Sequence, residues 1–184
     1  MAAGILTAAL SFVATNLGDI VILMLLFSAV RNVRTVTAGQ FLGVGILTAV
    51  TLLGAAGLGL LPTAYLRWLG LAPLVLGLRS WIHRNENDSD EGQLRAGKGS
   101  VLSVALLTVA NGGDNIGVWL PLFAGYTATQ RVAAVAVFAV MTGLWCFLGK
   151  RLSALPGVSG FLARYGNVLV PWVLMLLGVY ILFL

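Results

Sequence analysis

Six long apolar runs constrain this chain more than any other feature of its sequence. They cover residues 4–30, 37–61, 63–82, 100–125, 131–149 and 166–184. A helix needs about 20 apolar residues to cross the hydrocarbon core of a bilayer, so each run is long enough to span it. A membrane β-barrel would instead show segments of about 10 residues in which apolar and polar side chains alternate. The sequence therefore predicts an all-α, polytopic membrane protein with six transmembrane helices in a lipid bilayer.

Composition and charge exclude several other classes of protein. Only 9% of the 184 residues are charged and 59% are hydrophobic, whereas soluble domains carry about 25% charged residues. The formal net charge is +5, but the basic residues stand at the ends of apolar runs. They form no patch interleaved with aromatic side chains, so no nucleic-acid partner is expected. The single cysteine, Cys146, allows neither an intrachain disulfide nor a cysteine-based metal cluster.

Two aspartates lie inside the apolar runs and need a compensating partner. Asp19 and Asp114 are the only acidic residues outside the hydrophilic stretch 83–99. They occur in similar motifs 95 residues apart, Asn16-Leu17-Gly18-Asp19 and Asn111-Gly112-Gly113-Asp114-Asn115. An aspartate at the centre of a membrane helix costs about 2.5–3.5 kcal/mol. Neither run contains Lys or Arg, so we expect a bound cation or protons to compensate the negative charge.

The residues around these aspartates supply further oxygen ligands. Neutral side-chain oxygens come from four residues: Thr15, Asn16, Asn111 and Asn115. Three glycines favour local unwinding, which frees backbone carbonyls and places these residues along the substrate path: Gly18, Gly112 and Gly113. Oxygen-rich sets of this kind suit hard or borderline divalent ions. The sequence predicts a cation site built from these side chains with Asp19 and Asp114. The alternative is that each aspartate only caps a break in its helix.

The two motifs also indicate an internal repeat. A shift of 95 residues superposes Gly18 on Gly113 and Leu25 on Leu120 as well as the aspartates. Each motif opens a half of three apolar runs, residues 1–82 and 100–184, and the hydrophilic loop 83–99 joins the halves. Three is an odd number, so the halves enter the membrane from opposite sides. We expect a single domain, residues 1–184, of two inverted three-helix repeats with the ion site near the midplane. The runs that hold the motifs are too long to stand upright, so tilt or a break at the glycines is expected.

The distribution of Lys and Arg predicts the orientation. The second and fourth connections hold two basic residues, Arg67 and Arg131. The first, third and fifth hold nine: Arg31, Arg34, Arg79, Arg84, Arg95, Lys98, Lys150, Arg151 and Arg164. Cytoplasmic loops carry the excess of basic residues. This places the odd-numbered connections in the cytoplasm and both termini outside it.

Other residues in the runs have more than one interpretation. Gln40, in Gly39-Gln40-Phe41-Leu42-Gly43, is a candidate for the substrate path, and solvation near the interface is the alternative. Pro73 and Pro121 predict kinks in the third and fourth helices. Small-residue faces leave packing within a subunit or between two subunits open, and the second would make the chain a homodimer. These faces contain Gly43, Gly45, Gly54, Gly57 and Gly59.

Several of these segments resemble the cadmium-resistance transporters of the CadD type, in the lysine-exporter superfamily. The most specific is Gly112-Gly113-Asp114-Asn115-Ile116-Gly117; others are Val21-Ile22-Leu23, Gly39-Gln40-Phe41-Leu42-Gly43 and Leu69-Gly70-Leu71-Ala72-Pro73. The resemblance implies export of a divalent metal, cadmium in named members, from the bacterial cytoplasm across the inner (plasma) membrane. Some relatives carry a cysteine where this chain has Asn111. The missing thiolate favours a harder ion, such as Mn²⁺ or Ca²⁺, or another cationic solute.

The leading hypothesis is therefore a secondary transporter that exports a divalent metal cation in exchange for protons. Asp19 and Asp114 would alternate between metal-bound and protonated states, and no cofactor is expected. The chain holds no nucleotide-binding motif, so ATP-driven pumping is not expected. One alternative is an exporter of amino acids or small organic cations. An enzyme, an intramembrane aspartyl protease, is disfavoured because Asn111 replaces the first glycine of the Gly-x-Gly-Asp motif and because six helices are too few.

Overall fold

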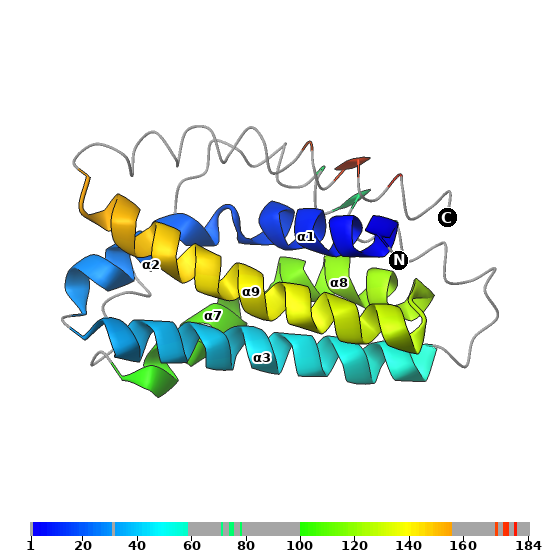
Figure 1. Ribbon diagram of the computed structural model, residues 1–184, viewed down its shortest axis with the longest axis horizontal. Coiled ribbons are helices and arrows are strands. Elements are labelled where there is room, and N and C mark those ends of the chain that lie inside the picture. The colour runs from blue at the N-terminus through cyan, green and yellow to red at the C-terminus, as the bar shows by residue number, and fades with distance from the viewer. Residues whose placement is uncertain are drawn as a thin grey trace.

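The computed structural model shows a helical protein. It describes residues 2–30, 32–58 and 100–155, with single helical positions at 71, 74, 75, 78, 172, 175, 176 and 179. The helices are α1 (Ala2–Asn16), α2 (Asp19–Ala29), α3 (Val33–Leu58), α7 (Val101–Asn111), α8 (Gly113–Gly125) and α9 (Ala128–Ser153) (Figure 1). This confirms the all-α prediction for the described ranges, which contain no strand. Apart from those single positions, the predicted helices 63–82 and 166–184 and the loop 83–99 lie outside the described residues.

Two of the helices are straight candidate membrane spans. α3 and α9 each have 26 residues and are apolar enough to cross a bilayer. The first and fourth predicted spans are instead broken. α1 and α2 meet at 63°, and α7 and α8 meet at 68°. The described residues thus hold two membrane spans, or four if each bent pair is one span. A break, and not tilt alone, accommodates the two runs that are too long to stand upright.

Both breaks fall within the glycine-containing motifs. The first lies at Leu17 and Gly18, and the second at Gly112. A Cβ atom on Gly112 would collide with the side chain of Leu47 in α3, so a larger residue at this break would force Leu47 to move. α8 continues without interruption through Pro121. The fourth predicted span is therefore interrupted at Gly112, and not at Pro121, which the sequence also offered as a site of kinking.

The long helices extend beyond the apolar runs from which they were predicted. α3 begins at Val33, where the sequence predicted residue 37. α9 begins at Ala128, before the predicted start at residue 131, and continues past residue 149 to Ser153. A capping box starts α9, because Thr127 and Gln130 each accept a hydrogen bond from the other's backbone N–H. Such a cap satisfies the free N–H groups at a helix start. Hydropathy marks the part of a helix that lipid can cover, whereas the caps mark where the helix begins.

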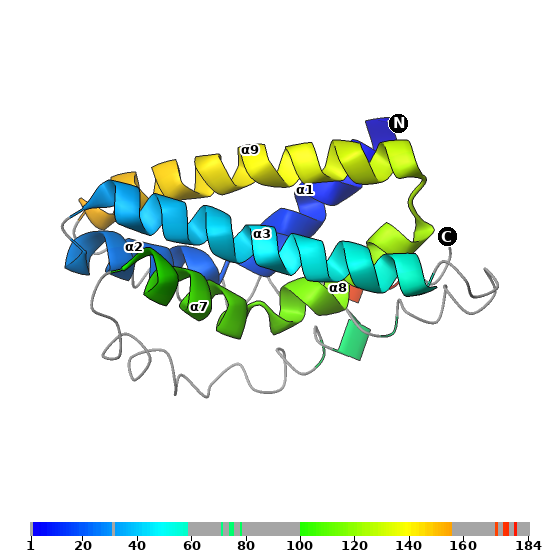
Figure 2. The same ribbon diagram turned by 90° about the horizontal axis from the view of Figure 1, so that it is seen from below.

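Each long helix packs against the broken helix pair from the other half of the sequence. α3 packs against α7 and α8, α9 packs against α1 and α2, and α3 and α9 also touch each other. Figures 1 and 2 show α3 and α9 running antiparallel along the long axis, with the two broken pairs also running in opposite directions. The same shift of 95 residues relates both bounds of α9 to the corresponding bounds of α3.

An aromatic cluster fills the space between α1, α8 and α9. The rings of Phe12 and Trp119 are stacked with centroids 6.0 Å apart. Phe138 packs against Trp119 at 4.3 Å and against Phe123 at 5.5 Å. All four side chains are at most 1% exposed. These rings pack α1, α8 and α9 tightly together, since protein cores leave little free space.

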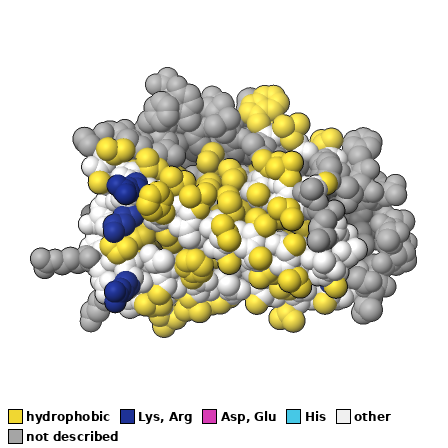
Figure 3. Space-filling model, in the orientation of Figure 1, with side chains coloured by type: hydrophobic (Ala, Val, Ile, Leu, Met, Phe, Trp, Pro, Cys, Tyr) yellow, Lys and Arg dark blue, Asp and Glu magenta, His cyan; other side chains and the backbone are white. Residues whose placement is uncertain are grey.

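The surface matches a protein surrounded by lipid. Large apolar side chains point outward from the long helices, including Leu53 at 75%, Val132 at 72% and Val140 at 71% exposure. Figure 3 shows them spread over the face of the molecule, while Lys and Arg gather at the end where α3 begins and α9 ends. Apolar side chains exposed on this scale need a nonpolar environment. The chain is therefore a membrane protein.

Candidate functional site

The two helix breaks meet in the interior of the molecule. Asn16, the last residue of α1, donates a hydrogen bond from Nδ2 to Oδ1 of Asn115, in the first turn of α8, at 3.1 Å. Both asparagines are fully buried. Asn16 Nδ2 also lies 2.9 Å from the carbonyl oxygen of Phe12 and 3.1 Å from Oγ1 of Thr15. Three of the four residues predicted to supply neutral oxygens are thus in or beside one buried network.

Trp145 holds this network from α9. Its indole Nε1 donates to the backbone carbonyl of Asn16 at 2.8 Å. A carbonyl at a helix end has no partner within its own helix, so the indole satisfies a group that the break exposes. The sequence offered no signal for this contact, because tryptophans in such chains more often lie at the interface or pack in the core. Trp145 is 6% exposed and does pack in the core.

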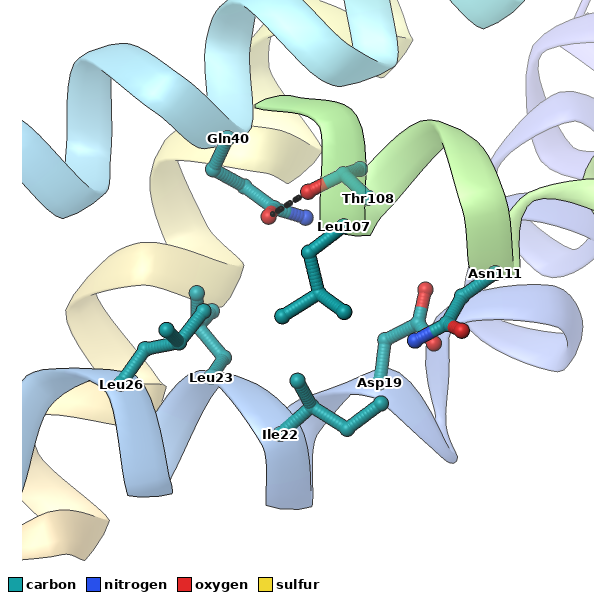
Figure 4. A pocket seen from close by; sticks show the side chains of 8 residues that line it. All are labelled: Asp19, Ile22, Leu23, Leu26, Gln40, Leu107, Thr108 and Asn111. Carbon is teal, nitrogen blue, oxygen red and sulfur yellow. Dashed lines mark hydrogen bonds between the residues drawn. The ribbon is translucent and has the colours of Figure 1, made fainter. Parts of the chain in front are cut away.

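A small pocket lies beside the break, between α2, α3 and α7 (Figure 4). Its polar lining consists of Asp19, Gln40, Thr108 and Asn111, and its apolar lining of Ile22, Leu23, Leu26 and Leu107. In Figure 4 the Asp19 carboxylate and the Asn111 amide point toward one another. The empty space is about 230 Å³ even when its open side is counted. The space that water-sized spheres can occupy is about 10 Å³, close to the roughly 10–15 Å³ that one water molecule needs, so this pocket suits an ion or a very small solute.

Gln40 and Thr108 face each other in this pocket. The hydroxyl of Thr108 donates to Oε1 of Gln40 at 2.8 Å, and it also lies 3.0 Å from the carbonyl oxygen of Val104. Thr108 is a site residue that the sequence prediction missed. Helical spacing offered a signal, because residues three apart lie on the same face of a helix and Thr108 precedes Asn111 by three.

Asp114 has different surroundings from Asp19. It lies in the first turn of α8, half-buried, and its Oδ1 accepts a hydrogen bond from the backbone N–H of Asn115 at 2.8 Å. It is not one of the residues that line the pocket. Asp19 likewise stands in the first turn of its helix, α2. The positive end of a helix stabilises a carboxylate there, so both positions also fit the capping alternative.

Two atoms of the buried network, and one of Trp119 a turn later in α8, have no hydrogen bond among the described residues. These are Oδ1 of Asn16, Nδ2 of Asn115 and Nε1 of Trp119. A buried amide oxygen without a donor is costly unless water or an ion completes it. Within the described ranges, no three His, Cys, Asp or Glu residues lie close enough together to hold a metal. A cation here would depend on amide, hydroxyl and backbone oxygens together with a carboxylate.

The glycines predicted to line the substrate path, and those predicted to form small-residue faces, differ in their surroundings. A Cβ atom on Gly18 or Gly113 would meet nothing within 4 Å among the described residues, whereas Gly112 is crowded by Leu47. In α3, Gly43 packs within the subunit against Thr108, and Gly54 against Leu120. Gly45 and Gly57 meet nothing within 4 Å in the described part of the chain, and Gly59 lies outside it.

Comparison with known proteins identifies the family. No curated protein and no solved structure gave a significant match. A family model described as cadmium resistance transporter matches residues 12–184. This range contains both aspartate motifs, the pocket and the two long helices. The chain therefore belongs to the cadmium resistance transporter family.

Proposed function

We propose that this membrane protein is a secondary transporter that exports a divalent metal cation in exchange for protons. The cation would bind where the two helix breaks meet, with Asp19 as its charged ligand and Asp114 as the charge at the second break. One observation carries the proposal: the Asp19–Asn111 pocket lies beside the buried Asn16–Asn115 contact, so both motifs meet at one place. Broken helices that meet in this way place half-helix ends and free carbonyls around an ion.

The ligand chemistry favours a hard or borderline ion. The polar atoms around the pocket are carboxylate, amide and hydroxyl groups, and none of its lining residues is a cysteine. The single cysteine, Cys146, lies on α9 within the buried core and does not line the pocket. Oxygen ligands suit Mn²⁺ and Ca²⁺, whereas thiolates favour softer ions. We therefore propose Mn²⁺ or Ca²⁺ as substrates alongside the Cd²⁺ that the family's description indicates.

We further propose that the two halves are inverted repeats, and that the protein alternates between two states. In each state the site is open toward one side of the membrane and closed toward the other. The shift of 95 residues pairs α1 with α7, α2 with α8 and α3 with α9. The packing of α1 against α8 then corresponds to the space between α2 and α7. The first is closed by the Asn16–Asn115 bond and the stacked rings of Phe12 and Trp119, whereas the second contains the pocket. Exchanging these two arrangements would carry the cation across the membrane.

The basic end of the molecule supports a cytoplasmic opening. Exposed Arg34, Lys150 and Arg151 lie where α3 begins and α9 ends, which is the end predicted to face the cytoplasm. Gln40 lies in the second turn of α3, and Thr108 lies in α7, which is on the side of the molecule nearer this basic end. A pocket open on this side can take up a cation for export, and both termini would then lie on the opposite side of a bacterial inner membrane.

Cysteine labelling tests this orientation. Because Cys146 is buried, a membrane-impermeant maleimide should report mainly on introduced cysteines. We expect Arg34→Cys and the pocket variant Leu107→Cys to react only after cells are permeabilised. Thr129→Cys, at the other end of α9, should react in intact cells. Labelling of Leu107→Cys in intact cells with no reaction of Thr129→Cys would contradict both the orientation and the side on which the pocket opens.

Transport by the purified full chain tests the function. In proteoliposomes, we expect uptake of at least one of Mn²⁺, Ca²⁺, Cd²⁺ and Zn²⁺ that is accelerated by a pH gradient and accompanied by proton movement. Liposomes without protein provide the background. If no divalent ion moves, the metal proposal is wrong. If amino acids or small organic cations move instead, the chain is a transporter of a different substrate. Metal flux that ignores the pH gradient would contradict proton exchange alone.

A further inference from the structure

The Thr108 hydroxyl has two hydrogen-bond acceptors but only one proton. Its Oγ1 lies 2.8 Å from Oε1 of Gln40 and 3.0 Å from the backbone carbonyl of Val104. A hydroxyl donates one hydrogen bond and can accept others. When the proton points to Gln40, the amide must present its carbonyl to Thr108. When the proton points to Val104, Thr108 becomes an acceptor, and Gln40 must present its NH₂ group instead.

The two arrangements offer different groups to the pocket. The oxygen and the nitrogen of an amide point in different directions, so the atom that faces Thr108 leaves the other toward the rest of the lining. With Oε1 on Thr108, as in Figure 4, the NH₂ group suits the pocket without a cation, because the charged group in the lining is then the Asp19 carboxylate. With NH₂ on Thr108, the carbonyl oxygen suits a bound cation. Both arrangements keep the Gln40–Thr108 hydrogen bond, so turning the amide costs little hydrogen bonding.

The backbone positions this pair firmly. Glycines precede and follow Gln40 on the face of α3 that meets α7. A Cβ atom on Gly39 would lie 2.5 Å from Cβ of Val104, and one on Gly43 would lie 2.6 Å from Cβ of Thr108. The two helices are thus in direct backbone contact on both sides of the pair. Gln40 is 4% and Thr108 6% exposed, so water competes little for the amide and hydroxyl groups.

We propose that Gln40 is a specificity-determining cation ligand whose amide turns its carbonyl toward the ion, and that Thr108 is its positioning residue. The inference rests on the proposed function, since it assigns ligands to the same cation site. It adds a neutral oxygen from α3 to the carboxylate of Asp19 and the amide of Asn111. The α3 helix, which carries neither aspartate, would then take part in choosing the ion.

Substituting the ligand atom tests the role of Gln40. We would measure binding of Mn²⁺ and of Cd²⁺ to the detergent-purified full chain by calorimetry. Gln40→Met keeps an unbranched side chain of similar length but replaces the amide with a soft thioether, whereas Gln40→Leu offers no ligand. We expect Gln40→Met to shift the ratio of Mn²⁺ to Cd²⁺ affinity toward Cd²⁺ on the order of tenfold. Gln40→Leu should weaken both ions and shift the ratio less.

The positioning role of Thr108 has its own matched variants. Thr108→Val removes the hydroxyl at nearly constant shape and should weaken Mn²⁺ binding by about tenfold, while Thr108→Ser should restore it. Thr48→Val is the control, because the Thr48 hydroxyl donates to Val44 of its own helix at 2.7 Å and does not line the pocket. Equal affinity ratios for Gln40→Met and Gln40→Leu would overturn the inference and leave the proposed function intact. A native chain that binds no divalent ion would overturn both.

Discussion

Asp19→Asn is expected to lower divalent-cation flux on the order of 100-fold or more, because it removes the charged ligand from the pocket. Asparagine has the shape of aspartate but cannot neutralise a cation. The substitution also separates the two interpretations of this position. Asp19 follows the N-cap Gly18 in the first turn of α2, so a carboxylate that only stabilised this helix start through its charge would cost about 0.3–1 kcal/mol of stability when replaced and would leave flux unchanged. Proteoliposome flux of the best-transported ion measures the effect.

Matched variants make this test specific. Asp19→Glu keeps the charge and should retain measurable flux, because only the reach of the carboxylate changes. Asp114→Asn is expected to lower flux as well, since the second motif also contributes a charge to the proposed site. Each variant should elute as the native protein does in detergent. If Asp19→Asn combined with Asp114→Asn leaves flux unchanged, neither carboxylate takes part in transport, and capping of the helix starts becomes the better account.

Much of this architecture could be predicted, because hydropathy reports directly on contact with lipid. The apolar runs predicted α3 and α9, and the glycines beside Asp19 and Asp114 offered a break as one way to fit an overlong run. The choice between tilt and break could not be made from sequence. It depends on how the other helices pack around each break: Gly18 has no described neighbour within 4 Å of an added Cβ atom, whereas the side chain of Leu47 in α3 crowds Gly112. That contact joins residues far apart in the chain.

The candidate site was predictable in its residue types but not in its partners. Asn16, Asn111 and Asp19 were identifiable because they are polar in apolar surroundings. The contact of Trp145 with Asn16 carries no such signal, since tryptophan is common in buried helices. Helical spacing could place Thr108 on the face of Asn111, but it could not identify Gln40 as the partner of Thr108. Sequence also treats Asp19 and Asp114 as equivalent. The structure distinguishes them because the α1–α8 side is filled by Phe12 and Trp119, while the α2–α7 side leaves a pocket.

Gly39→Ala is expected to have the largest effect on stability among conservative substitutions in α3. The added Cβ atom would lie 2.5 Å from Cβ of Val104 and 2.8 Å from the backbone carbonyl oxygen of Val101. A carbonyl in the α7 backbone cannot turn away as a flexible side chain can, so the helices must separate. Overpacking of this kind costs about 1–3 kcal/mol. The change should appear as a lower midpoint of thermal unfolding for the purified protein in detergent.

Gly45→Ala on the same helix provides the control, because its Cβ atom would meet nothing within 4 Å among the described residues. There the usual preference of a helix for alanine over glycine, about 0.5–1 kcal/mol, should apply without a steric cost. Gly45→Ala should therefore unfold at or above the native temperature. Equal midpoints for the two variants would mean that α3 and α7 are not in backbone contact. The Gln40–Thr108 pair would then lose the rigid support that its role as an ion-selective element requires.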